Sequence, residues 1–246
     1  TTESNFAKVE AGAIHPITGP VYIKGSEPGD LLEIEFIDIV PQPFGFSAII
    51  PGFGFLRDVF TSPFMVHWRI SDGWATSEQI PGVRIPGASF MGVSGVAPSQ
   101  SQLKQWAERE ADLESRGGLA LPPNIAGSVP ESGDAATHGL RTLPPRENGG
   151  NFAVKQLSKG SKLLLPVAVE GALFSTGDAH FAQGDGEVCV TAVEMGATVN
   201  VKFRILKGEA KQKNIRWPRF QRDSYFIEPQ WAAPRDFIVR WQRSAA

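Results

Sequence analysis

One short segment of the sequence collects side chains that bind metals and transfer protons. Asp178, His180, Gln183, Asp185 and Glu187 fall within residues 178–187, interspersed with glycine and alanine. Asp178, His180 and Glu187 carry the oxygen and nitrogen donors that a borderline ion such as zinc accepts. One of the carboxylates could serve instead as a general base. The segment therefore predicts either a metal site or a general-base site.

The same segment also fits a purely structural role. Asp185-Gly186 is a residue pair typical of tight hairpin turns. Acidic residues in turns often cap the backbone or face solvent, and the pattern Asp-x-His recurs by chance. From these residues alone, both interpretations stay open.

A second candidate segment combines glycines with side-chain amides, Glu147-Asn148-Gly149-Gly150-Asn151. Its glycines allow backbone N–H groups and the amides of Asn148 and Asn151 to turn toward a carbonyl oxygen, as in sites that hold an amide or a developing oxyanion. The alternative is an ordinary glycine turn, which the segment taken alone favours.

Most elements predicted around these segments are strands. The apolar runs at 162–170 and 187–195, and the alternation of apolar and polar residues at 199–205, each predict a strand. Residues 21–25 and 31–40 lie on either side of a Pro-Gly turn and predict a β-hairpin. The candidate metal segment is thus expected between two strands.

One helix interrupts this pattern. Ser99 and Gln102 have the spacing of a capping box, and apolar residues follow at helical spacing until Gly117, so a helix is predicted over 101–116. The 26 glycines and 19 prolines favour turns and short elements elsewhere. The predicted fold class is mainly β, an antiparallel β-sandwich with one helix-bearing insertion.

Composition restricts the partners and the compartment. The net charge of −2 and the lack of clustered Lys and Arg predict no nucleic-acid and no membrane partner. Interleaved Trp and Arg in the tail, 211–246, suggest either a platform for single-stranded nucleic acid or packing at a sheet edge or against another subunit. The net charge favours packing.

The single cysteine, Cys189, is expected to be buried and inert in its strand, and it excludes an intramolecular disulfide. With no basic, apolar leader visible, a cytoplasmic location is expected.

Four segments, taken together, resemble the acetamidase/formamidase family. They occur in the family's order and span about residues 15–195, and the last two are specific. The segments are His15-Pro16-Ile17-Thr18-Gly19-Pro20 running through Glu27-Pro28-Gly29-Asp30; Gly92-Val93-Ser94-Gly95-Val96-Ala97-Pro98; Pro145-Arg146-Glu147-Asn148-Gly149-Gly150-Asn151; and Leu165-Pro166-Val167 through Glu170-Gly171-Ala172-Leu173-Phe174-Ser175 to residues 177–188.

The resemblance implies a single domain over residues 1–246, shorter than family members at both ends. It implies a homo-oligomeric, zinc-dependent amidohydrolase that converts short amides of the formamide or acetamide type to a carboxylate and ammonia. Together with the two segments it assigns roles to seven residues. Asp178, His180 and Glu187 would hold the metal, Glu147 or Glu187 would act as the base, and Asn148, Asn151 or Gln183 would hold the amide.

Two positions depart from the family pattern. Ala153 stands where family members usually have an aspartate, and His15 stands where a different polar residue is more common. The loss of an acidic group at position 153 supports an alternative function, a non-catalytic relative that keeps the pocket as a small-molecule or metal-binding module.

Overall fold

The computed structural model describes residues 14–118 and 142–222, the single positions 132, 133, 137 and 139, and the backbone alone of 225–233 and 236–243. The elements in chain order are β1 (Ile17–Val21), β2 (Leu31–Ile49), β3 (Phe64–Ser71), β4 (Trp74–Thr76), β5 (Arg84–Pro86), β6 (Phe90–Gly95), α1 (Gln100–Ser115), β7 (Gly149–Asn151), β8 (Lys162–Pro166), β9 (Phe174–His180), β10 (Glu194–Leu206), α3 (Glu209–Gln212), β11 (Arg219–Arg222), β12 (Tyr225–Ala233) and β13 (Asp236–Arg243).

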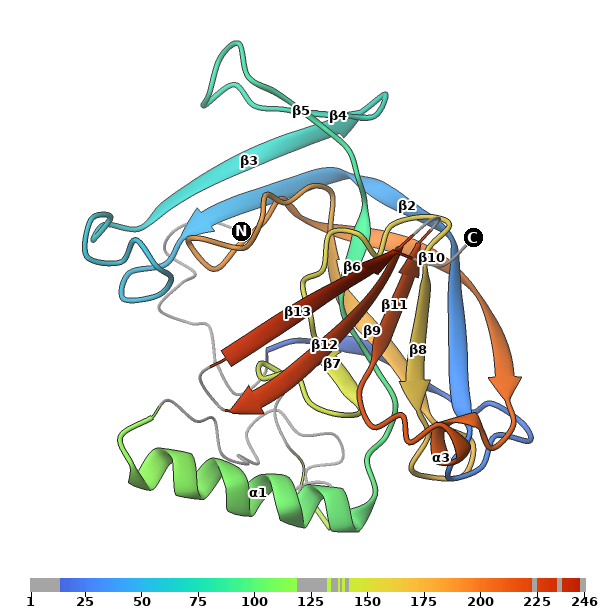
Figure 1. Cartoon of the computed structure of the whole chain (residues 1–246). Coiled ribbons are helices and arrows are strands. Elements are labelled where there is room, and N and C mark those ends of the chain that lie inside the picture. The colour runs from blue at the N-terminus through green and yellow to red at the C-terminus, as the bar shows by residue number, and fades with distance from the viewer. Residues whose placement is uncertain are drawn as a thin grey trace.

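One antiparallel sheet connects the described strands. Its order is β13-β12-β11-β8-β2-β10-β9-β6-β7, with β1 added on β9 and the arm β3-β4-β5 added on β2. The long strand β2 joins two regions of the sheet, because residues 31–35 pair with β8 whereas residues 44–49 pair with β3. Figure 1 shows β2, in blue, turning between these two partners.

A cluster of buried side chains fills the space between two parts of this sheet. Leu32 and Ile34 of β2 and Leu163 of β8 pack there with Phe90 of β6 and Phe174 of β9. Strand β8 is buried on both faces, which accounts for its uninterrupted apolar sequence. The predicted mainly β class is confirmed, and the facing layers belong to one continuous sheet rather than to two separate ones.

Between β9 and β10 the chain leaves the sheet and returns beside its point of departure. His180, the last residue of β9, is the cross-strand partner of Glu194, the first residue of β10. The intervening residues 181–193 form a loop that is closed at its base by a hydrogen bond of 2.8 Å from the Phe181 N–H to the Val193 carbonyl. The side chains of Phe181 and Val193 are buried with Trp68 of β3. The β3-β4-β5 arm therefore anchors the loop beside the candidate metal segment.

Helix α1 confirms the predicted helix and its cap. Ser99 Oγ accepts the Gln102 N–H, and the Gln102 side chain accepts the Ser99 N–H. The buried face of the helix carries Trp106 and Glu110, and Glu110 accepts hydrogen bonds of 2.6 and 2.9 Å from the buried guanidinium of Arg146. In Figure 1, α1 (green) lies at the opposite end of the molecule from the β3-β4-β5 arm. Neither described helix has the length and apolar character needed to cross a bilayer.

Two of the predicted strand features are wrong. The expected hairpin of residues 21–25 and 31–40 does not form, because residues 22–25 lie outside the strands and β1, which ends at Val21, pairs with β9 and not with β2. The expected strand 187–195 is instead a series of turns up to residue 193. Its alternating valines resembled a strand, but Val188 and Val190 face solvent, and Cys189 lies in a turn with intermediate exposure rather than in the core. The alternation at 199–205 does belong to a strand, β10.

Candidate metal centre

Three carboxylates surround one nitrogen of a histidine that has no exposed surface. His180 Nε2 lies 3.3 Å from Glu194 Oε2, 3.4 Å from Asp178 Oδ1 and 3.7 Å from Glu187 Oε1. This buried nitrogen makes no hydrogen bond, although the carboxylate oxygens of Asp178 and Glu194 face it. The arrangement suits a cation at the centre of the carboxylates.

The strands explain why these side chains meet. Asp178 and His180 are two residues apart on β9, the spacing that places side chains on one face of a strand. Asp178 has a left-handed backbone conformation, with φ 56°, which aspartate tolerates better than most residues. Glu194 reaches the same place from β10 as the cross-strand partner of His180. Its second oxygen, Oε1, accepts the Ala192 N–H at 2.9 Å, which fixes the carboxylate.

Gly92 of β6 provides the space for the Asp178 side chain. A Cβ atom at this position would collide with Asp178 Oδ2 and would lie 2.8 Å from the Asp178 carbonyl oxygen. The Gly92 carbonyl also accepts the N–H groups of Phe152 and Ala153, at 3.0 and 3.1 Å. One residue of β6 thus contacts Asp178 and also fixes the segment that follows β7.

The far side of the imidazole ring is held by other residues. His180 Nδ1 lies 3.1 Å from Gln183 Oε1, and Gln183 Nε2 donates to the Ala153 carbonyl at 2.8 Å. Phe90 packs edge-on against the ring, with 4.9 Å between the centroids and an angle of 84°. These contacts fix the ring plane.

The charges of the cluster favour a positive centre. Burial opposes protonation of His180, but the Asp178 and Glu194 carboxylates outweigh it and raise the pKa of His180 to about 10. Burial raises the pKa of Glu187 to about 7; the negative charges of Glu194 and Asp178 add to this rise, and His180 opposes it. Burial also opposes ionisation of Asp178, yet His180 and His15 hold its pKa below the usual range.

The donor set fits a divalent metal ion. Asp178, His180 and Glu194 each offer a ligand atom, and these atoms lie within 4.8 Å of one another. Imidazole nitrogen with carboxylate oxygen is a common combination for zinc. Of the predicted ligands, the structure brings Asp178 and His180 together, and Glu187 lies at the edge of the same cluster.

A cavity of about 730 Å³ opens at Asp178 and Glu194. His15 lines it, with its Nε2 3.8 Å from Asp178 Oδ2. Burial lowers the pKa of His15, with the charge of His180 in the same direction, although Asp178 and Glu194 oppose the change. Apolar side chains, among them Met91, form much of the remaining wall. The cavity thus combines polar groups at the cluster with an apolar lining.

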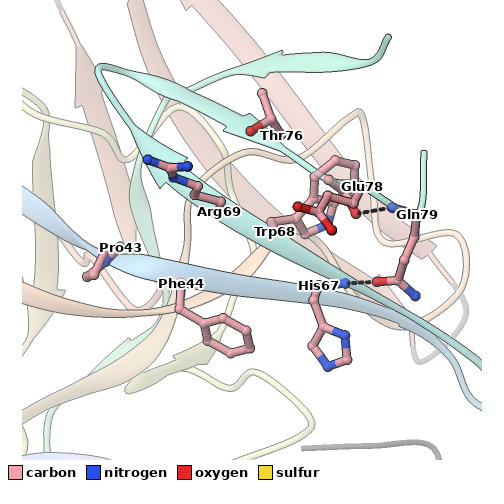
Figure 2. A pocket seen from close by; sticks show the side chains of 9 residues that line it. Pro43, Phe44, His67, Trp68, Arg69, Thr76, Glu78 and Gln79 are labelled. Carbon is pink, nitrogen blue, oxygen red and sulfur yellow. Dashed lines mark hydrogen bonds between the residues drawn. The ribbon is translucent and has the colours of Figure 1, made fainter. Parts of the chain in front are cut away.

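A second hollow, of about 590 Å³, shares Phe44 with this cavity. Figure 2 shows Phe44 and His67 directed to the same side of the β2–β3 pair, with the His67 N–H donating to Gln79 Oε1. The rings of Phe44 and His67 are 5.9 Å apart between centroids. The two hollows therefore adjoin at Phe44.

The second predicted segment is not part of the cluster. Glu147 accepts hydrogen bonds of 2.8 and 3.3 Å from Arg109 of α1, and Asn148 Nδ2 donates to the Val96 carbonyl at 2.6 Å. Strand β7 pairs with the end of β6 at Gly95, whereas His180 pairs with Phe90 at its beginning. About 17 Å of strand separates these two positions.

Asn151, the last residue of β7, lies between these two ends of β6. It pairs with Val93 of β6, and Val93 pairs on its other side with Gly177 of β9.

Residues Glu194 and His15 were not predicted as part of the site. Glu194 is separated from His180 by the loop 181–193, so only the register of β9 and β10 reveals their contact. His15 carries no spacing signal of its own, because it reaches Asp178 from the other end of the sequence.

Fold and cluster together define an antiparallel β protein with a candidate metal site. The sequence model of the Acetamidase/Formamidase family matches residues 1–239. The acetamidase of Mycolicibacterium smegmatis is 39% identical over 225 residues, covering 81% of this chain and 55% of that protein. The formamidase of Methylophilus methylotrophus is 36% identical over 249 residues, covering 94% of this chain and 60% of that protein.

A solved structure agrees with these sequences. The gamma lactamase from Delftia acidovorans matches with a TM-score of 0.84 and 35% identity, covering 92% of this chain and 62% of that one. The chain belongs to the acetamidase/formamidase family. It spans less than two thirds of the length of each of these three relatives.

Proposed function

We propose that this chain hydrolyses short-chain amides of the formamide or acetamide type, giving a carboxylate and ammonia, with a divalent metal that we take to be zinc. The supporting observation is the buried Nε2 of His180, which makes no hydrogen bond and faces Asp178 and Glu194 at the mouth of a cavity. Family membership supports the substrate class, since named relatives are an acetamidase and a formamidase.

Asp178, His180 and Glu194 would hold the ion. A bound divalent ion supplies charge that polarises the amide carbonyl and acidifies water. Glu187, beside the cluster, takes the proton of the attacking water as the new C–O bond forms. It then passes this proton to the amide nitrogen as the C–N bond breaks and ammonia leaves. The Glu187 side chain is 19% exposed, so solvent reaches it.

The remaining residues position these groups and the substrate. His15 faces the second oxygen of Asp178 and keeps that carboxylate oriented. Among the predicted amide-holding residues, Asn151 is level across β6 with Gly177, a residue of the cavity wall, and we keep for Asn151 the predicted recognition of the substrate amide. Glu147 and Asn148 have partners at the other end of β6 and have no role in this mechanism.

Ammonia release from formamide and acetamide, with and without a chelator, tests the proposal. We expect release that stops with the chelator and returns with zinc. His180→Ala and Glu194→Gln should abolish it, whereas His67→Ala and Glu170→Gln, matched changes outside the cluster, should not. Chelator-insensitive release would remove the metal from the mechanism, and no release from the zinc-loaded chain would contradict the function.

The alternative is a metal-binding relative without catalysis. Ala153→Asp restores the acidic residue usual in the family, at a position whose left-handed conformation, with φ 43°, suits aspartate. If the unchanged chain binds zinc but is inactive, and this variant gains turnover, the chain is a disabled enzyme. We expect the unchanged chain to be active already.

We also propose that the chain forms homo-oligomers in the cytoplasm. The segment after β2 exposes several large apolar side chains, with Phe55 91% and Val59 68% exposed, and such patches commonly mark protein contacts. The single cysteine agrees with a reducing compartment. Sedimentation velocity of the chain and of a Phe55→Ser, Val59→Ser variant checks the assembly, and a monomeric starting chain would contradict it.

A further inference from the structure

The side-chain amide of Gln183 has a defined orientation. Its Nε2 lies 2.8 Å from the Ala153 carbonyl oxygen, which can only accept. A flipped amide would place two oxygens against each other at that distance. Gln183 Oε1 therefore faces His180 Nδ1, 3.1 Å away. Because this oxygen can only accept, the proton of a neutral His180 ring is on Nδ1, and the lone pair is on Nε2.

We propose that Gln183 is a positioning residue that presents His180 Nε2 to a divalent metal ion. This inference rests on the metal site of the proposed function, and it gives Gln183 a different role from the substrate-holding one predicted from sequence. The hydrogen bond to Nδ1 fixes both the tautomer and the ring plane. Partners of this kind on the far nitrogen of a histidine ligand orient the ring and raise its basicity.

The anchor of Gln183 is itself fixed to the sheet. The Phe152 and Ala153 N–H groups both bind the Gly92 carbonyl on β6, which holds the Ala153 carbonyl in place. A continuous series of hydrogen bonds thus runs from β6 through Ala153 and Gln183 to the imidazole of His180. Since Gly92 also adjoins Asp178, the same point of β6 sets the positions of two ligands.

The surroundings of Gln183 separate it from the substrate. Its side chain lines a hollow that it shares with Gln156 and Thr191, whereas Asp178 and Glu194 line the proposed substrate cavity. The imidazole of His180 lies between Gln183 on the Nδ1 side and the carboxylates on the Nε2 side. A residue in this place acts through the histidine.

Three variants of the full chain test the inference. Gln183→Leu removes the acceptor at nearly constant size, Gln183→Glu keeps an acceptor, and Gln156→Leu makes the same chemical change in the same hollow. The affinity for zinc is measured by competition with a chromogenic chelator, and the ligand field by the visible absorption of the cobalt-loaded protein. KM and kcat for formamide are then measured at saturating zinc.

We expect Gln183→Leu to bind zinc about 10- to 100-fold more weakly and to alter the cobalt spectrum, with KM for formamide unchanged at saturating zinc. Gln183→Glu keeps the acceptor for Nδ1 but loses the donor to the Ala153 carbonyl, so it should recover part of the affinity, and Gln156→Leu should behave as the unchanged chain. Should the Leu variant fail to fold, the zinc affinity of the Glu variant relative to the unchanged chain still decides, because an acceptor role requires that part of this affinity is retained.

Several results would overturn the inference. Unchanged zinc affinity in Gln183→Leu, or a raised KM with normal affinity, would return Gln183 to substrate binding. Zinc affinity in Gln183→Glu no higher than in Gln183→Leu would exclude the acceptor role, because both variants lose the donor to the Ala153 carbonyl and only the Glu variant keeps the acceptor. If the unchanged chain binds neither zinc nor cobalt, this inference and the metal site both fail. If it binds zinc but releases no ammonia, only the proposed function fails, and the affinity ratios still decide the role of Gln183.

Discussion

At the scale of single residues, Gly92 matters because it has no side chain. Its hydrogen atom faces Asp178, and its carbonyl fixes the segment that anchors Gln183. A Cβ atom added at Gly92 would meet the backbone carbonyl of Asp178 as well as its carboxylate. A change of the Asp178 rotamer therefore cannot relieve the strain.

We expect Gly92→Ala to lower the free energy of unfolding by about 1–3 kcal/mol and to weaken zinc binding by displacing the Asp178 carboxylate. Urea unfolding and zinc titration of the same preparation measure the two effects. Gly184→Ala is the matched control, because a Cβ there meets nothing within 4 Å. Normal zinc affinity in the Gly92 variant would show that Gly92 does not set the position of the Asp178 carboxylate.

Among single residues, the sequence predicts site partners only where they are close along the chain. Asp178 and His180 share one strand, so their spacing alone predicts that they act together. Glu194 is reached only through the β9–β10 pairing, and Gln183 folds back onto Nδ1 through a loop whose course the spacing does not define. Glu147 was predicted as a possible base from its segment and the family resemblance, and the structure adds a contact that the segment does not reveal, a hydrogen bond from Arg109 of α1.

At the scale of elements, two ion pairs link α1 to the segment before β7. Arg146 and Glu110 are buried, with side chains 5% and 11% exposed, whereas the Arg109 side chain in the Arg109–Glu147 pair is 41% exposed. Burial makes an unpaired charge costly, while exposed pairs contribute little. The buried pair is therefore the one that fixes α1.

Arg146→Met should destabilise the chain by about 3–5 kcal/mol, because it leaves the Glu110 carboxylate buried without its partner. Arg109→Met, which breaks the exposed pair on the same helix, should cost at most about 1 kcal/mol. Thermal and urea unfolding compare the two variants. Adding Glu110→Leu to Arg146→Met should recover part of the lost stability. If Arg146→Met alone cost no more stability than Arg109→Met, the buried pair would not be the one that fixes α1.

The elements were predictable where the signals are local. The capping box of Ser99 and Gln102 defines the start of α1 within a few residues. The hairpin expected around the Pro-Gly turn was wrong because strand partners depend on the whole sheet: residues 22–25 lie outside the strands, and β1, which ends at Val21, pairs with β9. Turn chemistry shows that the chain reverses, but it does not show which strand lies beside the next one.

At the scale of the whole molecule, buried carboxylates tie together strands that are distant in sequence. Glu33 of β2 accepts hydrogen bonds from Arg204 of β10 and Lys162 of β8. Asp30 accepts the N–H groups of Glu27 and Gly208. Burial opposes ionisation of both groups, but these donors outweigh it, so the pKa of each carboxyl lies below its ordinary value.

These lowered pKa values predict instability in acid. The unfolded chain takes up protons near the ordinary pKa values of 3.8 and 4.5, while the native carboxylates remain ionised. The stabilisation is therefore complete above these values and is lost as the pH falls through the lowered native ones. Urea unfolding should show that the free energy of unfolding falls less between pH 6 and pH 3 for Glu33→Gln than for the unchanged chain. Glu35→Gln, on the same strand, is the control, and equal slopes for all three would refute the linkage.

The loop between β9 and β10 has a consequence for how such a centre arises. Asp178, His180 and Glu194, with Gln183 and Glu187 between them, all lie within residues 178–194, and the two ends of that stretch meet as neighbouring strands. The centre is thus nearly contiguous in the gene. It could be transplanted as one cassette into another antiparallel strand pair, provided that the host places a glycine opposite the aspartate and a carbonyl within reach of the glutamine.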